Sequence, residues 1–376
     1  MAEWISKTLG ELTSFISKGI PPKYVDEENE NTIRVLNQKC NRNFEISYNE
    51  SRIHNAAVKK VPENKLLHSG DVLINSTGTG TAGRVAQIFN IPMATTVDGH
   101  MILLRPTKEI DPLYYGYVIK SYQKKIESLA EGSTGQTEIN RQRLQDEIYI
   151  TFPKDRALQK EIGTFLFQID EKIKNNSEIN NNLEQQAQSI FDNMFPNISN
   201  GSCTIGDYIT PKRGKSLLSK NAIFGDVPVI AGGLEPSTYH NVANTRSPVL
   251  AISASGANAG YVSLWNIPIW SSDSSYIDSS MTDDVYFWYV LLKKRQKEIF
   301  DAQTGSAQPH IYPQHIASMS VSNLDIEEVH SYTSIVIPIF EIIGHHKEEN
   351  TRLASLRDTL LPKLMSGELD VSNIEI

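Results

Sequence analysis

The sequence predicts an α+β protein with two β-rich domains in tandem, each followed by a long helix, and the two helices forming an antiparallel coiled coil. Three observations lead to this fold class. Several motifs occur twice, in the same order, along the 376 residues. Short apolar runs that end at glycine, serine and threonine turns indicate strands in both halves. Each half ends in a segment whose apolar residues recur every seven positions, which is typical of a coiled-coil helix.

The internal repeat is carried by four pairs of segments. The matching residues are 8–12 and 204–208, 78–85 and 255–262, 90–93 and 266–269, and 135–139 and 307–311. In the second pair Gly83 aligns with Gly260. The order of the motifs is preserved while the offset between them drifts, so we interpret the chain as a pseudo-two-fold duplication of a whole domain with its helix.

This duplication predicts four segments along the chain. They are a first domain at residues 1–153, a central spacer helix at 154–196, a second domain at 197–326, and a C-terminal spacer helix and tail at 327–376. Within the domains, the apolar runs predict strands at 71–76 and 247–253, return strands at 84–89 and 261–265, and helices at 112–129 and 282–300.

Each spacer helix shows a heptad seam with one polar interruption. The predicted seam residues of the first helix are Ile162, Phe165, Ile169, Asn176, Ile179, Leu183 and Ile190. Those of the second are Ile335, Ile339, Ile342, His346, Leu353, Leu356 and Leu360. Polar side chains on such a seam can fix its register. The alternative is an ordinary amphipathic helix on a globular core, but the length of the seam and its recurrence favour the coiled coil.

Composition narrows the class of protein. The net charge of −8 argues against nucleic acid as a partner. Most of the excess acidic residues fall in the predicted helices, however, so a basic face on each domain stays possible. Cys40 and Cys203 lie in different halves, which predicts free thiols in a reducing cytoplasm and excludes a cysteine-based zinc site. No apolar run is long enough for a membrane helix, and the first residues lack the pattern of a secretion signal.

Several catalytic motifs fail on inspection. Residues 78–83 have the glycine spacing of a dinucleotide-binding turn, but a strand rather than a helix is predicted to follow. Gly214-Lys215-Ser216 resembles the end of a phosphate loop, yet Ile209 stands where the first glycine is required. The histidine pairs lack convincing zinc spacing. We therefore predict no catalytic residue and no metal site.

Polar, turn-rich loops recur at equivalent places in the two halves. Arginine can bond guanine, asparagine and glutamine can bond adenine, and lysine, serine and threonine can hold phosphates. The DNA-binding candidates of the first half are Lys23, Tyr24, Asn41, Arg42, Thr79, Thr81, Arg84, Gln136, Asn140, Arg141 and Arg143. Those of the second half are Lys212, Arg213, Lys215, Ser216, Tyr239, Asn258, Tyr261, Gln308, His310 and Tyr312. For any single residue, an ordinary solvated loop is the alternative.

The C-terminal residues 356–367, LRDTLLPKLMSG, resemble the closing signature of the specificity subunits of type I restriction–modification systems. Residues 159–162 and 169–173 resemble the central spacer of that family, and residues 9–12 and 69–73 are similar to its recognition domains. The resemblance covers essentially the whole chain. It is specific in the helices and shallow in the domains.

The resemblance implies a non-catalytic, cytoplasmic subunit that reads double-stranded DNA. Each domain would read one half of a split, asymmetric site, and the helices would set the spacing and dock two methyltransferase subunits. Restriction/translocase subunits would join that core, and S-adenosylmethionine, ATP and Mg²⁺ would belong to these partners. The alternatives left open are a recognition subunit of another modification or phage-defence system, a stand-alone enzyme with an undetected site, and a structural coiled-coil adaptor.

Overall fold

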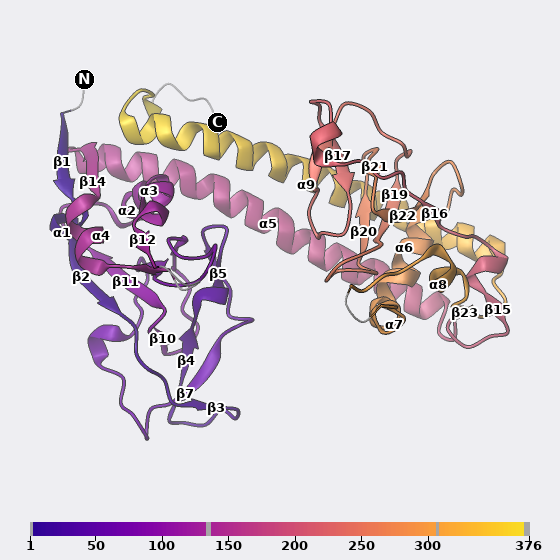
Figure 1. The fold of residues 1–376 in the computed structure, drawn as a ribbon, viewed down its shortest axis with the longest axis horizontal. Helices are drawn as coiled ribbons and strands as arrows, with labels where there is room; N and C mark the ends of the chain where they lie inside the picture. The colour runs from indigo at the N-terminus through magenta and orange to yellow at the C-terminus, as the bar shows by residue number, and fades with distance from the viewer. Residues whose placement is uncertain (1–2, 133–136, 306–307, 372–376) are drawn as a thin grey trace. The chain divides into compact units, whose positions relative to one another are not determined.

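The computed structural model describes residues 3–132, 137–305 and 308–371 (Figure 1). The chain divides into two compact units. Unit 1 comprises Met1–Lys172 and Arg352–Ile376, and unit 2 comprises Ile173–Thr351. Two long helices, α5 (Arg156–Met194) and α9 (Ile326–Ser366), each contribute residues to both units.

Two four-stranded sheets form most of unit 1. The first is antiparallel, in the order β2 (Thr13–Lys18), β11 (Met101–Pro106), β8 (Val72–Asn75) and β9 (Val85–Gln87). The second is mixed, in the order β10 (Thr95–Val97), β4 (Thr32–Leu36), β7 (Arg52–Asn55) and β3 (Tyr24–Val25). Every residue of β8 is buried, as expected for a central strand between two neighbours.

Short strand pairs and helices complete unit 1. The pairs are β1 (Trp4–Thr8) with β14 (Tyr149–Pro153), β5 (Asn41–Arg42) with β6 (Glu45–Ile46), and β12 (Ala130–Glu131) with β13 (Glu138–Ile139). The short helices are α1 (Leu9–Leu12), α2 (Pro112–Ser121), α3 (Gln123–Ser128) and α4 (Arg141–Glu147). Leu36, Leu73, Val97 and Leu103 bring strands of both sheets into one apolar core.

Unit 2 is built from similar parts. One sheet has the order β16 (Lys212–Arg213), β22 (Ser274–Asp278), β19 (Val249–Ser253) and β20 (Val262–Trp265). The other has the order β18 (Thr238–His240), β17 (Val227–Ile230) and β21 (Trp270–Ser271). A further pair joins β15 (Cys203–Thr204) to β23 (Ser320–Val321), and the short helices are α6 (Val285–Lys294), α7 (Gln296–Asp301) and α8 (Pro313–Ala317).

The two main sheets follow the same plan. In each, the first strand along the chain lies at one edge, the last is second, and the strand at the opposite edge follows a glycine turn. Gly83 and Gly260 close these turns at φ of 90° and 87°, a region that favours glycine. The predicted strands and return strands are confirmed. Each predicted helix is instead two helices, separated at Tyr122 in unit 1 and at Arg295 in unit 2.

Segments of α5 and α9 contact each other within each unit. In unit 1 the Arg357 guanidinium donates to the Asp170 carboxylate at 2.5 Å. In unit 2 the Asn176 amide donates to Glu349 at 2.6 Å and to Asn350 at 2.9 Å. The Asn180 amide oxygen lies 2.8 Å from Nδ1 of His346. The predicted polar residues of both seams therefore meet partners on the other helix.

The predicted apolar seam of α9 is wrong in register by one residue. Ile335, Ile342 and Leu356 are 49%, 44% and 47% exposed, whereas the residues that follow the first two, Val336 and Ile343, are buried. Ile339, Leu353 and Leu360 are only half-buried. Apolar residues fill nearly every position from 335 to 343, so a seven-residue spacing fits two adjacent registers there.

The seam predicted for α5 agrees better with the structure. Ile162, Phe165, Ile169 and Asn176 are buried, and Leu183 and Ile190 are half-buried. Ile179 is the exception, because its side chain is 45% exposed. Polar residues separate the apolar ones along most of α5, so only one register fits its sequence.

Candidate nucleic-acid interface

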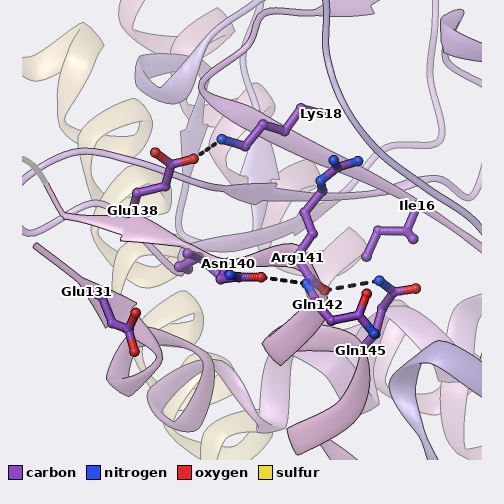
Figure 2. Close-up of a pocket in the computed structure, with 9 residues that line it drawn as sticks. Ile16, Lys18, Glu131, Glu138, Asn140, Arg141, Gln142 and Gln145 are labelled. Atoms are coloured by element: carbon purple, nitrogen blue, oxygen red, sulfur yellow. Dashed lines mark hydrogen bonds and ion pairs between the residues drawn. The ribbon is translucent and has the colours of Figure 1, made fainter.

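An open pocket of about 790 Å³ lies in unit 1 where β2, β13 and α4 meet (Figure 2). Its polar lining is Lys18, Glu131, Glu138, Asn140, Arg141, Gln142 and Gln145. Lys18 is the last residue of β2, and its ammonium forms an ion pair with the carboxylate of Glu138 on β13. Figure 2 shows this pair beside the side chain of Arg141.

The start of α4 positions Arg141, one of the two cationic residues that line this pocket. The Asn140 side chain caps the helix by accepting from the backbone N–H groups of Gln142, at 2.8 Å, and Arg143. Arg141 is therefore the first residue of the helix, and its side chain is exposed. Burial, and next the charge of Arg141, lower the pKa of Lys18 and of Lys65. These three cations crowd one side of unit 1.

A comparable polar site occurs in unit 2, at the end of β16. The Arg213 guanidinium lies 2.5 Å from one oxygen of the Asp273 carboxylate, and the Ser255 hydroxyl donates to the other oxygen. The imidazole of His310 stacks on the ring of Tyr312 with centroids 6.0 Å apart. The structure thus brings the predicted residues His310 and Tyr312 together, as it does Asn140 and Arg141 in unit 1.

The other described candidates of unit 1, apart from Asn41, are exposed or half-buried. Lys23, Arg42 and Thr79 are exposed, and Thr81 is half-buried. The ring of Tyr24 is covered by the Arg52 guanidinium at 3.5 Å, and Arg84 donates to the carbonyl of Gly80 at 3.2 Å. Arg143 forms ion pairs with Glu131 and Glu147. Gln136 lies outside the described residues.

Asn41 is a correction to the predicted interface. Its side chain is fully buried, and its amide donates to the Arg84 carbonyl at 2.9 Å and to the Asn75 side chain at 3.2 Å. A buried amide nitrogen needs acceptors, and here strand and turn groups supply them. Asn41 therefore ties the β5–β6 hairpin to the main sheet and is not accessible to DNA.

The candidates of unit 2 are mostly exposed as well. Lys212, Lys215, Ser216, Tyr239, Gln308 and Tyr312 are exposed, and Asn258 is half-buried. Tyr261 is engaged within the unit, because the Lys293 ammonium lies 4.5 Å from the centre of its ring. Both residues line a second pocket, of about 450 Å³.

Two buried histidines that were not predicted from the sequence bind loop backbone near the candidate residues. In unit 1, Nδ1 of His54 accepts from the backbone N–H of Lys23 at 2.8 Å. In unit 2, Nδ1 of His240 accepts from the backbone N–H of Ile223 at 3.0 Å. His100 and Asp273 were not predicted either, because their equivalence follows from strand pairing rather than from any sequence motif.

No group of three or more histidine, cysteine, aspartate or glutamate side chains suited to a metal ion was found in residues 3–132, 137–305 and 308–371. Over the same ranges, no helix combines the length and the apolar character that crossing a membrane requires. Cys40 and Cys203 are free thiols.

Comparison with known proteins defines the class. Residues 1–185 match the family described as the type I restriction modification DNA specificity domain. Residues 1–185 therefore belong to this family, and the chain as a whole is similar to specificity subunits of type I restriction–modification systems.

One relative matches along nearly the whole chain. The type I restriction enzyme MjaIX specificity subunit of Methanocaldococcus jannaschii is 24% identical over 416 aligned positions, covering 99% of this chain and 95% of the relative. A solved structure supports the fold. The crystal structure of the type I restriction–modification S subunit from M. genitalium matches with a TM-score of 0.61 at 20% identity, covering 96% of each chain.

Proposed function

We propose that each unit recognises one half of a bipartite, asymmetric site in double-stranded DNA. The observation that carries this proposal is the shared strand order of the two main sheets, combined with different side chains at equivalent loop positions. Two similar frameworks can approach DNA in the same way, whereas different loop residues can select different bases. We infer that the units are a pseudo-two-fold internal repeat.

We also propose that α5 and α9 form an antiparallel coiled coil that fixes the gap between the half-sites. The contacts between the two helices support an antiparallel arrangement, because residues further along α5 contact residues earlier in α9. Within unit 2, Asn176 bonds to Asn350 and Asn180 bonds to His346. Continuous helices suit a ruler, because an α-helix rises a constant 1.5 Å per residue.

The exposed apolar residues of α9 support docking of other subunits. Ile335 and Ile342 are exposed at seven-residue spacing in unit 2, and Leu356 is exposed in unit 1. Exposed apolar stripes of this kind are typical of protein interfaces. We infer that two methyltransferase subunits dock on the helices and that restriction/translocase subunits join them. The chain itself would be non-catalytic and act in the cytoplasm, and S-adenosylmethionine, ATP and Mg²⁺ would be bound by the partners.

The proposal is tested by exchanging residues 197–326 for the corresponding domain of another specificity subunit. Methylome sequencing of a host that carries the complete system then reads the modified site directly. We expect one half of the split motif to change and the other half to stay the same. A motif that stays wholly unchanged, or that changes in both halves, would contradict the assignment of one half-site to each unit.

A further inference from the structure

Four side chains gather at the end of the first edge strand in unit 1, and four gather at the equivalent place in unit 2. We call these the end clusters. The end cluster of unit 1 is Lys18, Thr77, His100 and Glu138, and that of unit 2 is Arg213, Ser255, Asp273 and His310.

Backbone hydrogen bonds establish which positions correspond. Lys18 pairs with Ile102 as Arg213 pairs with Ser275. The backbone carbonyl of Met101, just before Ile102, accepts from the N–H of Gly19. In the same way, the carbonyl of Ser274, just before Ser275, accepts from the N–H of Gly214. One residue earlier, the backbone carbonyl of His100 accepts from the N–H of Ser76 at 2.8 Å, and that of Asp273 accepts from the N–H of Ala254 at 3.1 Å. His100 and Asp273 therefore occupy equivalent positions.

The remaining two positions are matched by isolated bridges. Thr77 forms an antiparallel bridge with Glu138, and Ser255 forms the same bridge with His310. Each end cluster therefore contains one cation, one hydroxyl, one acid and one histidine. The acid and the histidine have exchanged places between the units. Glu138 corresponds to His310, and Asp273 corresponds to His100.

The cation is paired with the acid in both end clusters, although the acid comes from a different position in each. Lys18 pairs with Glu138 and Arg213 pairs with Asp273. All four side chains are partly exposed, with 32% and 54% of the first pair and 41% and 38% of the second accessible. Such exposed ion pairs contribute little to folding stability. Fold stability therefore does not explain why each unit pairs the equivalent cation with an acid, or why that acid comes from a different position in each unit.

We propose that Lys18 and Arg213 each hold a phosphate of the bound duplex, and that Glu138 and Asp273 occupy the place of that phosphate when DNA is absent. This inference rests on the proposed function, DNA recognition by each unit. A carboxylate and a phosphate accept hydrogen bonds from the same cationic donors. In unit 1 the exposed guanidinium of Arg141 lines the same pocket and adds a second positive charge.

The carboxylate has a consequence for specificity. Phosphate contacts carry no sequence information, so any duplex can offer one. Each acid competes with every phosphate, correct site or not. At the correct site, base contacts offset the loss of the internal ion pair. At other sites they do not, so the acids lower non-specific affinity.

The test is a Glu138→Gln substitution in the full chain, assembled with its modification subunit. The probe is a fluorescein-labelled duplex of arbitrary sequence, and its anisotropy is measured between about 50 and 200 mM salt. We expect roughly threefold to tenfold tighter binding, with a slope of log K against log salt steeper by about 0.9. Glu109→Gln, which breaks the exposed ion pair with Lys7 instead, is the matched control and should change neither value.

A double substitution separates competition from simple charge repulsion. Lys18→Gln should weaken binding, and Lys18→Gln with Glu138→Gln should bind no more tightly than Lys18→Gln alone. If Glu138→Gln strengthens binding by the same factor with or without Lys18, the acid acts by repelling DNA and the proposal is overturned. Unchanged binding by Glu138→Gln also overturns it.

The second unit provides an independent arm. Asp273→Asn should loosen specificity in the same way, since Arg213 is then released. An assembled wild-type complex that methylates no bipartite site would refute the proposed function. A complex that methylates its site normally, with Glu138→Gln and Asp273→Asn both binding non-specific DNA as the wild type does, would refute only the phosphate competition.

Discussion

Polar side chains buried between α5 and α9 in unit 2 show how single residues can specify pairing. Asn176 is 1% exposed and donates to both Glu349 and Asn350. Asn350 in turn donates to the carbonyl of Ile173 at 3.1 Å and to Ser177 at 3.2 Å. A helix pair shifted by one turn would leave these groups without partners, so they favour one register at some cost in stability.

Replacing Asn176 by alanine should therefore destabilise the protein. Its loss removes the hydrogen bonds to Glu349 and Asn350, which costs about 1–3 kcal/mol of unfolding free energy. Urea denaturation followed by circular dichroism measures this. Asn181→Ala, at an exposed position of the same helix, is the control and should lie within about 0.5 kcal/mol of the wild type. Equal loss in both variants would contradict the role given to Asn176.

A histidine on α9 makes one contribution to stability depend on pH. Nδ1 of His330 lies 2.9 Å from the carboxylate of Asp284, just before α6, and this hydrogen bond raises the pKa of His330. A histidine pKa raised in the folded state stabilises the protein fully below the unfolded value of about 6.5, and the contribution is lost as pH rises through the folded value.

Replacing Asp284 by asparagine should bring the pKa of His330 down toward the ordinary value. NMR titration of the imidazole resonances measures it directly, and the wild type should lose more stability than the variant between slightly acidic and slightly alkaline pH. Ser334→Ala removes a hydroxyl bonded to the His330 carbonyl but leaves the carboxylate, so it should leave the titration unchanged. A midpoint that stays raised in Asp284→Asn would show that another group is responsible.

At the scale of elements, sequence periodicity predicted those helices and strands that depend on residues close together in the chain. The strands β8 and β19 and both long helices follow from apolar runs and heptads. The mixed sheet of unit 1 was not predicted, because β3, β4 and β7 are short and mostly half-buried, and their pairing joins distant residues. The breaks at Tyr122 and Arg295 also carry no glycine or proline signal.

The candidate site was predictable in outline only. Loop composition indicated where polar residues gather: Asn140 and Arg141 line the pocket beside β2, and His310 and Tyr312 stack on each other. Burial of Asn41 could not be foreseen, because its partners Asn75 and Arg84 are distant in the sequence and meet it only in the folded unit. The register of α9 failed for a similar reason, since its apolar residues satisfy two spacings and packing within unit 2 selects one.

In each unit, a glycine of one long helix lies in close contact with residues of that unit's domain. In unit 1, a Cβ added to Gly163 of α5 would lie 2.7 Å from the backbone nitrogen of Tyr114. In unit 2, one added to Gly344 of α9 would lie 2.6 Å from the Asn266 side chain. Glycine is unfavourable inside a helix, so its presence at Gly163 is explained by the need for a short distance between α5 and α2.

Gly163→Ala should consequently destabilise unit 1. Alanine improves helix propensity by about 1 kcal/mol, but overpacking against a backbone atom that cannot rotate away costs about 1–3 kcal/mol. We expect a net loss, measured by thermal or urea denaturation. Gln168→Ala on the exposed face of the same helix gains propensity without a clash and should not destabilise. A Gly163→Ala protein as stable as Gln168→Ala would mean that the helix can move away freely.

For the whole molecule, the boundary between the units falls inside both long helices, after Lys172 in α5 and before Arg352 in α9. Under the proposed function, helix length added there in both helices should change the gap in the DNA site and nothing else. Residues 166–172 and 352–358 are seven-residue segments that contain the paired Asp170 and Arg357. Repeating both segments together preserves the heptad and the ion pair.

The number of repeats decides the outcome, because DNA is helical. One added heptad in each helix lengthens the ruler by about 10 Å, or roughly 3 base pairs, which turns the second half-site about a third of the way around the duplex. Three added heptads give about 31 Å, or roughly 9 base pairs, which returns it nearly to the same face. We expect methylation by the three-heptad protein at a motif whose gap is longer by about 9 or 10 base pairs, and weak methylation by the one-heptad protein. Methylome sequencing distinguishes them, and three heptads added to α5 alone should prevent assembly. A three-heptad protein that still methylates the original spacing would show that the helices do not measure the gap.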